Sequence, residues 1–97
     1  MELYAYLVTY DISDPKRWKK VYECMKNFGE HLQLSVFHCD LTAQRHVRLK
    51  ASLESLVHHE EDQVLIVKLG KSRPALNELI EVIGRPGRIE LPGPKIV

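Results

Sequence analysis

The chain has 97 residues, of which 44% are apolar and 28% charged, and its formal net charge is +1. These values predict one small folded domain and exclude a disordered or collagen-like chain and a globally basic nucleic-acid binder. We expect a cytoplasmic protein with no membrane contact, because no apolar run approaches the ~18–20 residues that a bilayer requires and the two cysteines suit a reducing compartment.

The first third of the chain predicts a strand followed by a helix. Residues 3–12 (LYAYLVTYDI) are apolar at both alternating sets of positions, which indicates a central strand covered on both faces. Asp14 and Pro15 suit the N-cap and the first residue of a helix, and Gly29 suits its end. Between them, apolar residues recur at three- and four-residue steps: Trp18, Val21, Tyr22, Met25 and Phe28.

The middle of the chain is less clearly patterned. Residues 31–41 (HLQLSVFHCDL) form either a hairpin of two short strands or one long strand, and no Gly, Asn or Pro near Ser35 marks a turn. Thr42 caps a second predicted helix, residues 58–62 predict a solvated loop, and residues 63–69 predict a further apolar strand. The pattern of residues 75–83 fits a helix or a strand equally well.

Two helices on one face of a sheet predict an α+β two-layer domain, which we assign to residues 1–84. If residues 31–41 form a hairpin, the order is the ferredoxin-like βαββαβ; if they form one strand, the sheet is a small parallel one. Residues 85–97 begin with a turn and contain further prolines, so they suit only an edge strand or an arm. The second sheet face also carries large apolar side chains, which favours a symmetric homodimer. The alternative is that the arm covers the sheet of its own chain.

Asp11 is the leading candidate for chemistry. It lies at the C-terminal end of the first predicted strand, and Asp14 already provides the helix cap, so Asp11 has no evident structural role beyond that of a turn residue. One carboxylate holds Mg²⁺ weakly, because this ion usually binds one or two carboxylates together with waters and substrate phosphates. In a two-fold dimer, a pair of Asp11 residues could share one Mg²⁺, or Mn²⁺ in its place, with nucleic-acid phosphates completing the site.

Four basic residues gather at the start of the first predicted helix. Cations there oppose the helix macrodipole by ~0.3–1 kcal/mol each, so helix stability does not explain them, whereas a bound anion would. An ordinary solvated helix face is the alternative. Together with Asp11 just upstream, the cluster predicts contacts with a nucleic-acid backbone through Lys16, Arg17, Lys19 and Lys20. Dinucleotide-binding, Walker A and zinc-protease motifs are absent from the sequence.

Three segments together resemble the Cas2 family of CRISPR-associated proteins. They are residues 10–12 (YDI), the helix start at residues 14–20, and residues 33–37 (QLSVF) followed by Cys39 and Leu41. The resemblance covers residues 3–70 in order and spacing, and the QLSVF block is its most specific part. It implies a ferredoxin-like fold with a break near Ser35, a symmetric homodimer with facing sheets, and a C-terminal strand that reaches toward the partner.

The resemblance also implies a function in spacer acquisition. Asp11 would be the Mg²⁺ ligand of a metal-dependent endonuclease that cleaves RNA or DNA, with Tyr10 beside it in the catalytic site. Arg17 matches the basic residue after the first strand, and Ser35 and Phe37 match a block near the dimer axis, where we expect nucleic-acid contacts. The family dimer also bridges two copies of the integrase Cas1, so a non-catalytic scaffold is the second expectation. A ferredoxin-like ribonuclease toxin outside CRISPR is the third.

Overall fold

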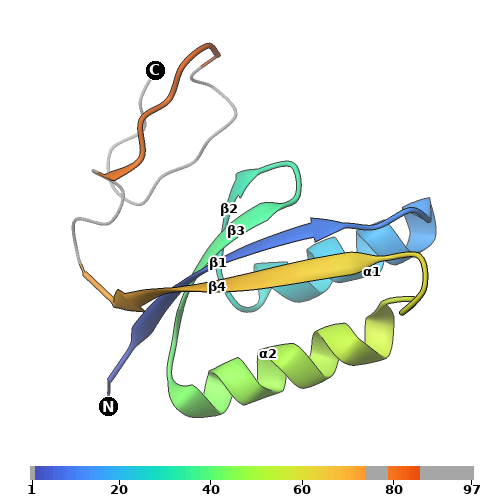
Figure 1. Cartoon of the computed structure of the whole chain (residues 1–97), viewed down its shortest axis with the longest axis horizontal. Helices are drawn as coiled ribbons and strands as arrows, with labels where there is room; N and C mark the ends of the chain where they lie inside the picture. Colours follow the sequence, from blue (N-terminus) through green and yellow to red (C-terminus); the bar gives the residue numbers. More distant parts are fainter. Residues whose placement is uncertain (1, 74–78, 86–97) are drawn as a thin grey trace.

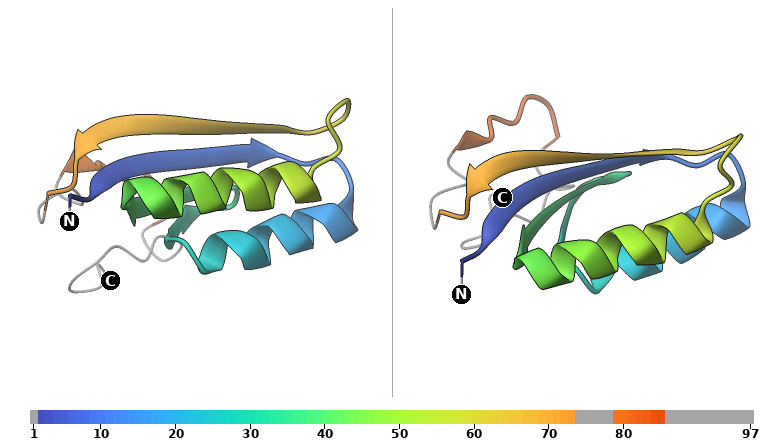
Figure 2. Two further views of the ribbon diagram at one scale, coloured as in Figure 1. Left: turned by 90° about the horizontal axis from the view of Figure 1, so that it is seen from below. Right: turned by 60° about the horizontal axis from the view of Figure 1, so that its bottom comes forward.

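The computed structural model describes residues 2–73 and 79–85. Along the chain these residues form β1 (Tyr4–Asp11), α1 (Pro15–Lys26), β2 (Glu30–Gln33), β3 (Val36–Leu41), α2 (Ala43–Leu56) and β4 (Gln63–Lys71). The strands make one antiparallel sheet in the order β2-β3-β1-β4, and both helices lie on the same face of it (Figures 1 and 2). This is the ferredoxin-like arrangement, so the predicted α+β fold is confirmed.

Both helices begin where their capping residues predict. The Asp14 carboxylate accepts a hydrogen bond from the backbone N–H of Arg17 at 2.9 Å, and the Thr42 hydroxyl accepts one from the N–H of Arg45 at 3.2 Å. Gly29 follows α1 in tight contact with β3: a Cβ atom there would collide with the carbonyl oxygen of His38 and with Sγ of Cys39. The end of α1 is therefore set by close packing as well as by local sequence.

The stretch over residues 31–41 is a hairpin, so the single-strand alternative is wrong. Gln33 pairs with Val36 across a two-residue turn made by Leu34 and Ser35. No non-glycine residue in the described part of the chain has a positive φ, so this turn does not need the Gly or Asn that a primed turn requires. A tertiary contact secures it instead: the backbone N–H of Tyr10 donates to the carbonyl oxygen of Ser35 at 3.1 Å.

The core fills the space between the sheet and the helix layer, which consists of α1 and α2. On β1, Tyr6, Val8 and Tyr10 face the helices, and all three are buried. Alternation along a strand places these residues on one face, as the sequence predicts for the even-numbered positions. Their buried partners come from β3, α1 and α2: Phe37, Cys39, Leu41, Val21, Met25, Leu49 and Leu53.

The other sheet face, which we call the open face, is formed by Leu7, Thr9, Leu65, Val67 and Leu69 on β1 and β4. The predicted cover on both faces is complete on the helix side and partial on the open face, where Ala5 is buried but the apolar residues of β4 are not. The side chains of Leu65, Val67 and Leu69 are 51%, 44% and 47% exposed. This is a large apolar area for a small domain to leave in water.

Two residues beyond β4 lie beside the open face. Leu79 and Ile80 line a cavity of about 300 Å³ together with Leu7 and Leu69. Residues 80–83 form neither a helix nor a strand, while residues 75–78 and the predicted arm from residue 86 onward lie outside the described residues. The domain boundary at residue 84 therefore stays a prediction. Within residues 2–73 and 79–85, no helix is long and apolar enough to cross a membrane.

Candidate functional site

Asp11 lies at the end of β1, where its Cα partner on β4 is Gln63. Alternation along the strand puts its side chain on the same face as Leu7 and Thr9, and the residue is exposed. Among the residues that the structure describes, no side chain or backbone group forms a hydrogen bond with its carboxylate. Asp11 is therefore an unengaged carboxylate at one end of the open face.

Tyr10 points to the sheet face opposite to that of Asp11. This orientation corrects the predicted catalytic set, which placed the two side chains together. Its hydroxyl is buried, has no hydrogen-bond partner in the described structure, and lies on the helix side of the sheet among aromatic rings. Burial raises the pKa of Tyr10 to about 12, so the phenol stays protonated at neutral pH. Because adjacent strand residues face opposite ways, this hydroxyl cannot assist a reaction at the Asp11 carboxylate.

Ser35 and Phe37 occupy different environments although they are two residues apart. Ser35 sits in the hairpin turn, where its hydroxyl accepts a hydrogen bond from the indole N–H of Trp18 at 3.2 Å. Its contact with nucleic acid stays a prediction. Phe37 is fully buried, and its ring lies 5.0 Å from that of His31 and 5.9 Å from that of Tyr22 between centroids. The predicted nucleic-acid contact of Phe37 is therefore replaced by a role in the core.

The predicted lysine cluster lies on the exposed side of α1. Lys16 and Lys20 are one helical turn apart and point away from the buried Val21 and Met25. The two helices together carry eight basic and two acidic residues, out of 14 and 13 in the whole chain. The helix layer is therefore strongly positive while the rest of the chain is negative. The predicted backbone contacts of Lys16, Lys19 and Lys20 remain a prediction that this charge separation supports.

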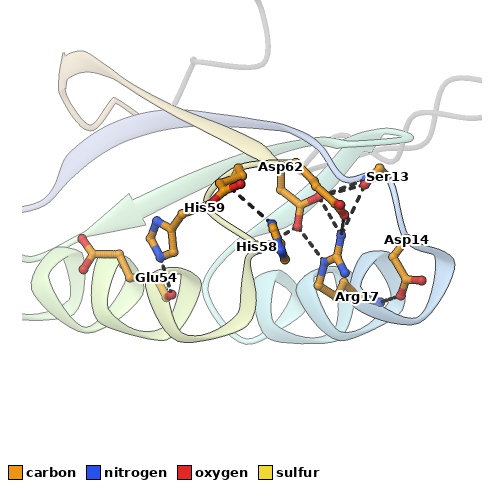
Figure 3. A network of polar contacts seen from close by, with 9 residues as sticks. Ser13, Asp14, Arg17, Glu54, His58, His59 and Asp62 are labelled. Atoms are coloured by element: carbon orange, nitrogen blue, oxygen red, sulfur yellow. Dashed lines mark hydrogen bonds and ion pairs between the residues drawn. The ribbon is translucent and has the colours of Figure 1, made fainter.

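Arg17 differs from the three lysines because its guanidinium is bound within the chain (Figure 3). Nε donates to the Asp62 carboxylate at 2.8 Å, and Nη2 contacts Asp62 at 3.2 Å and Glu61 at 3.1 Å. Only 25% of the Arg17 side chain is exposed, and that of Asp62 is fully buried. The bonds from Arg17 and from the backbone N–H of His58 and Ser13 hold the pKa of Asp62 well below its usual range.

The sequence interpretation missed Asp62, because residues 58–62 have the composition of a solvated loop. Arg17 and Asp62 are 45 positions apart, and no local pattern links them. The one available signal was the basic residue itself: a cation in the first turn of a helix needs a partner there. The structure shows that this partner is a carboxylate of the same chain.

The Asp11 end of the domain suits part of a magnesium site. In the described parts of the chain, no group of three or more His, Cys, Asp and Glu side chains could hold a metal ion. Mg²⁺ prefers oxygen ligands and commonly takes one or two carboxylates, with waters and phosphates as the others. The exposed Asp11 carboxylate has the right chemistry for one such ligand.

Comparison with known proteins gives the same family for the sequence and for the fold. The family model described as "CRISPR associated protein Cas2" matches residues 4–74. A protein of Rhodospirillum rubrum named "CRISPR-associated endoribonuclease Cas2 1" is 43% identical over 82 residues, which cover 84% of this chain and 79% of the relative. One of Halalkalibacterium halodurans, named "CRISPR-associated endonuclease Cas2", is 34% identical and covers 93% and 96% of the two chains.

Solved structures agree with these sequence relatives. The crystal structure of Streptococcus pyogenes Cas2 at pH 6.5 superposes with a TM-score of 0.73 and 28% identity, covering 82% of this chain and 99% of that one. The matched region of the family model includes Asp11, α1 with its lysines, the β2–β3 hairpin and Asp62.

Proposed function

This chain belongs to the Cas2 family of CRISPR-associated proteins, and on that premise we propose that it is a metal-dependent endonuclease that cleaves phosphodiester bonds of RNA or DNA during spacer acquisition in the cytoplasm. The names of its relatives support the nuclease activity: one is called an endoribonuclease and another an endonuclease. Family membership also favours a CRISPR function over the ribonuclease toxin considered from sequence.

The observation that carries the proposal is the state of the Asp11 carboxylate. It is exposed at a strand end, and among the described residues it has no hydrogen-bond or ion-pair partner, while the neighbouring Asp14 and Asp62 are both engaged with backbone N–H groups. A carboxylate with no structural task at the edge of an apolar face is suited to bind a metal ion or a substrate.

A homodimer would complete the site. The open face exposes Leu65, Val67 and Leu69, and a second copy of the same face would bury these side chains. A two-fold axis near the β1 ends would bring the two Asp11 carboxylates together. They would then hold one Mg²⁺, or Mn²⁺, between them. When bound, the ion would polarise the phosphodiester and lower the pKa of an attacking water.

The remaining residues of the site would act on the nucleic acid. Lys16, Lys19 and Lys20 would bind phosphates outside the dimer interface, which positions the strand without reading its sequence. Ser35 would fix the hairpin beside β1 through its bonds with Trp18 and Tyr10. The chemistry would rest on Asp11, because Tyr10 faces the core.

A non-catalytic scaffold is the second candidate. The lysines are exposed residues of α1, and both helices lie on one face of the sheet (Figure 2). Strand alternation places the Asp11 side chain on the other face, so the lysines and Asp11 belong to opposite sides of the sheet. In this alternative the dimer would hold DNA on its helix layers and bridge two copies of the integrase Cas1, and Asp11 would serve the dimer interface.

The test compares the wild type with Asp11→Asn and Glu60→Gln, using RNA and duplex DNA with Mg²⁺ and with EDTA. Glu60 is an exposed carboxylate in the loop before β4, so its amide variant is a matched control. Light scattering first establishes that all three proteins are dimers. Cleavage that needs both the metal and Asp11, and survives in Glu60→Gln, supports the nuclease. Equal activity in all three proteins would place the site elsewhere, and binding without cleavage in the wild type would favour the scaffold.

A further inference from the structure

The carboxylate of Asp62 is the centre of a hydrogen-bond network (Figure 3). It accepts five hydrogen bonds: from the backbone N–H of Ser13 at 3.1 Å and its hydroxyl at 3.3 Å, from the backbone N–H of His58 at 2.8 Å, and from Nε and Nη2 of Arg17 at 2.8 and 3.2 Å. Its side chain is fully buried. A buried carboxylate with every lone pair engaged constrains the groups that bind it.

This network lies directly beyond the last strand pair of the candidate site. Asp62 immediately precedes Gln63, which is the Cα partner of Asp11, and Ser13 follows Asp11 by two residues. The side chain of Asp62 thus continues the β1–β4 connection after the backbone ladder has ended. It ties the β1–α1 loop, residues 12–14, to the α2–β4 loop, residues 57–62.

We propose that the Asp62–Arg17 pair is a positioning device for Asp11, and that Arg17 acts through Asp62 rather than by binding nucleic acid. The pair fixes the backbone on both sides of the Asp11–Gln63 pairing, so the Asp11 carboxylate is presented in one orientation at the end of the open face. This inference rests on the proposed function of Asp11 as the reacting carboxylate.

The chemistry around Arg17 argues against a phosphate contact. Nε donates to Asp62, and Nη2 donates to Asp62, Glu61 and Ser13, which leaves only Nη1 without a partner among the described residues. A phosphate would also have to approach two carboxylates that already neutralise the guanidinium. By contrast, Lys16 and Lys20 are exposed one turn apart, on the side of α1 that faces away from the core.

Two conservative substitutions break the Asp62–Arg17 pair while keeping a polar side chain of similar size at each position. Asp62→Asn keeps the shape and one acceptor oxygen but removes the charge, and Arg17→Lys keeps the charge but cannot form the two-atom contact with a carboxylate. Glu61→Gln is the matched control, because it removes only the ion pair between Arg17 and Glu61, whose side chain is 58% exposed. All variants are compared at a temperature where circular dichroism shows that each is folded.

The kinetic test separates positioning from binding. We expect Asp62→Asn and Arg17→Lys to lower kcat by about 10–100-fold, as losses of a supporting contact at a metal site commonly do, while Glu61→Gln keeps the wild-type rate. A third variant, Arg17→Gln, removes the charge, and KM and the salt dependence of nucleic-acid binding should stay unchanged in it. A raised KM or a salt slope that falls by about one would make Arg17 a phosphate ligand and overturn the proposal. Wild-type kcat in folded Asp62→Asn and Arg17→Lys would overturn it as well.

A second measurement does not depend on nuclease activity. Amide hydrogen exchange of Ser13 and the NMR signal of Asp11, with and without Mn²⁺, report the loop geometry directly. We expect faster exchange at Ser13, a shifted Asp11 signal and weaker Mn²⁺ broadening in Asp62→Asn, with none of these changes in Glu61→Gln. If the wild type neither cleaves nor responds to Mn²⁺, the proposed function fails while the shift and exchange still test the positioning. An unchanged Ser13 exchange rate and Asp11 signal would refute the positioning role.

Discussion

Replacing Phe37 by alanine should destabilise the fold by about 3–5 kcal/mol, the range found for emptying a fully buried phenylalanine site. Phe37 is completely inaccessible to solvent, and three aromatic rings surround it, those of Tyr10, Tyr22 and His31, at centroid distances of 6.3, 5.9 and 5.0 Å. A buried phenylalanine removes roughly 150–250 Å² from water, and each ring contact adds about 0.5–1.5 kcal/mol beyond that burial. Because a small domain is stable by only about 5–15 kcal/mol, this loss is a large part of the total.

Urea unfolding followed by the fluorescence of Trp18, the single tryptophan, measures the loss. All proteins are compared at one protomer concentration, since dimer formation adds to the apparent stability. Leu34→Ala is the control, because Leu34 is 63% exposed in the hairpin turn and should change the free energy of unfolding by less than about 0.5 kcal/mol. Phe37→Leu, which keeps most of the volume, should bind nucleic acid like the wild type. A stable Phe37→Leu protein with weakened binding would refute the core assignment and restore the contact predicted from sequence.

Three further predictions concern packing, thiol reactivity and pH. Gly29→Ala should lower the urea midpoint by an amount equivalent to about 1–3 kcal/mol, because its methyl group would collide with the backbone of His38; an unchanged midpoint would contradict the close approach of α1 and β3. Iodoacetamide at pH 8 should modify the partly exposed Cys24 of the native protein before Cys39, since burial raises the pKa of Cys39 to about 12 and little thiolate forms; equal native rates would exclude this burial. The pKa of Asp62 is depressed by folding, so the stability it confers is present above the unfolded-state pKa and should be lost as the pH falls below about 4. Asp62→Asn should flatten this part of the pH–stability curve, and a curve parallel to that of the wild type would argue against a native ion pair.

Local sequence signals predicted those parts of the fold that short-range contacts determine. Asp14 and Thr42 cap their helices through N–H groups three residues away, and the sequence contains both partners of each bond. The alternation of Tyr10 and Asp11 along one strand also already indicated that the two side chains face opposite ways. Pairing them in one catalytic site followed the family resemblance rather than this geometry.

The features that sequence could not predict depend on distant residues. The turn at Leu34 and Ser35 has neither of the residues that usually mark a two-residue hairpin, and it is held by Tyr10 and Trp18 from other elements. The Arg17–Asp62 pair joins the first turn of α1 to the α2–β4 loop, and these two segments adjoin only after β1 and β4 have paired. Charge patterns along the chain show which residues are polar, but they do not show which of them neutralise one another.

The separation of Asp11 from the lysines constrains how one chain can use both. Asp11 belongs to the open face, while Lys20 projects from the side of α1 that faces away from the sheet. A nucleic acid that contacts both in one chain must pass around the β1–α1 end of the domain, where the Asp62–Arg17 network holds the loops in place. If two open faces meet in a dimer, the Asp11 pair lies inside and both helix layers lie outside, so phosphates bound by the lysines belong to a different segment from any phosphate at Asp11. Weakened binding in lysine variants and lost cleavage in Asp11→Asn should then be independent of each other, because the two groups act on different parts of the nucleic acid.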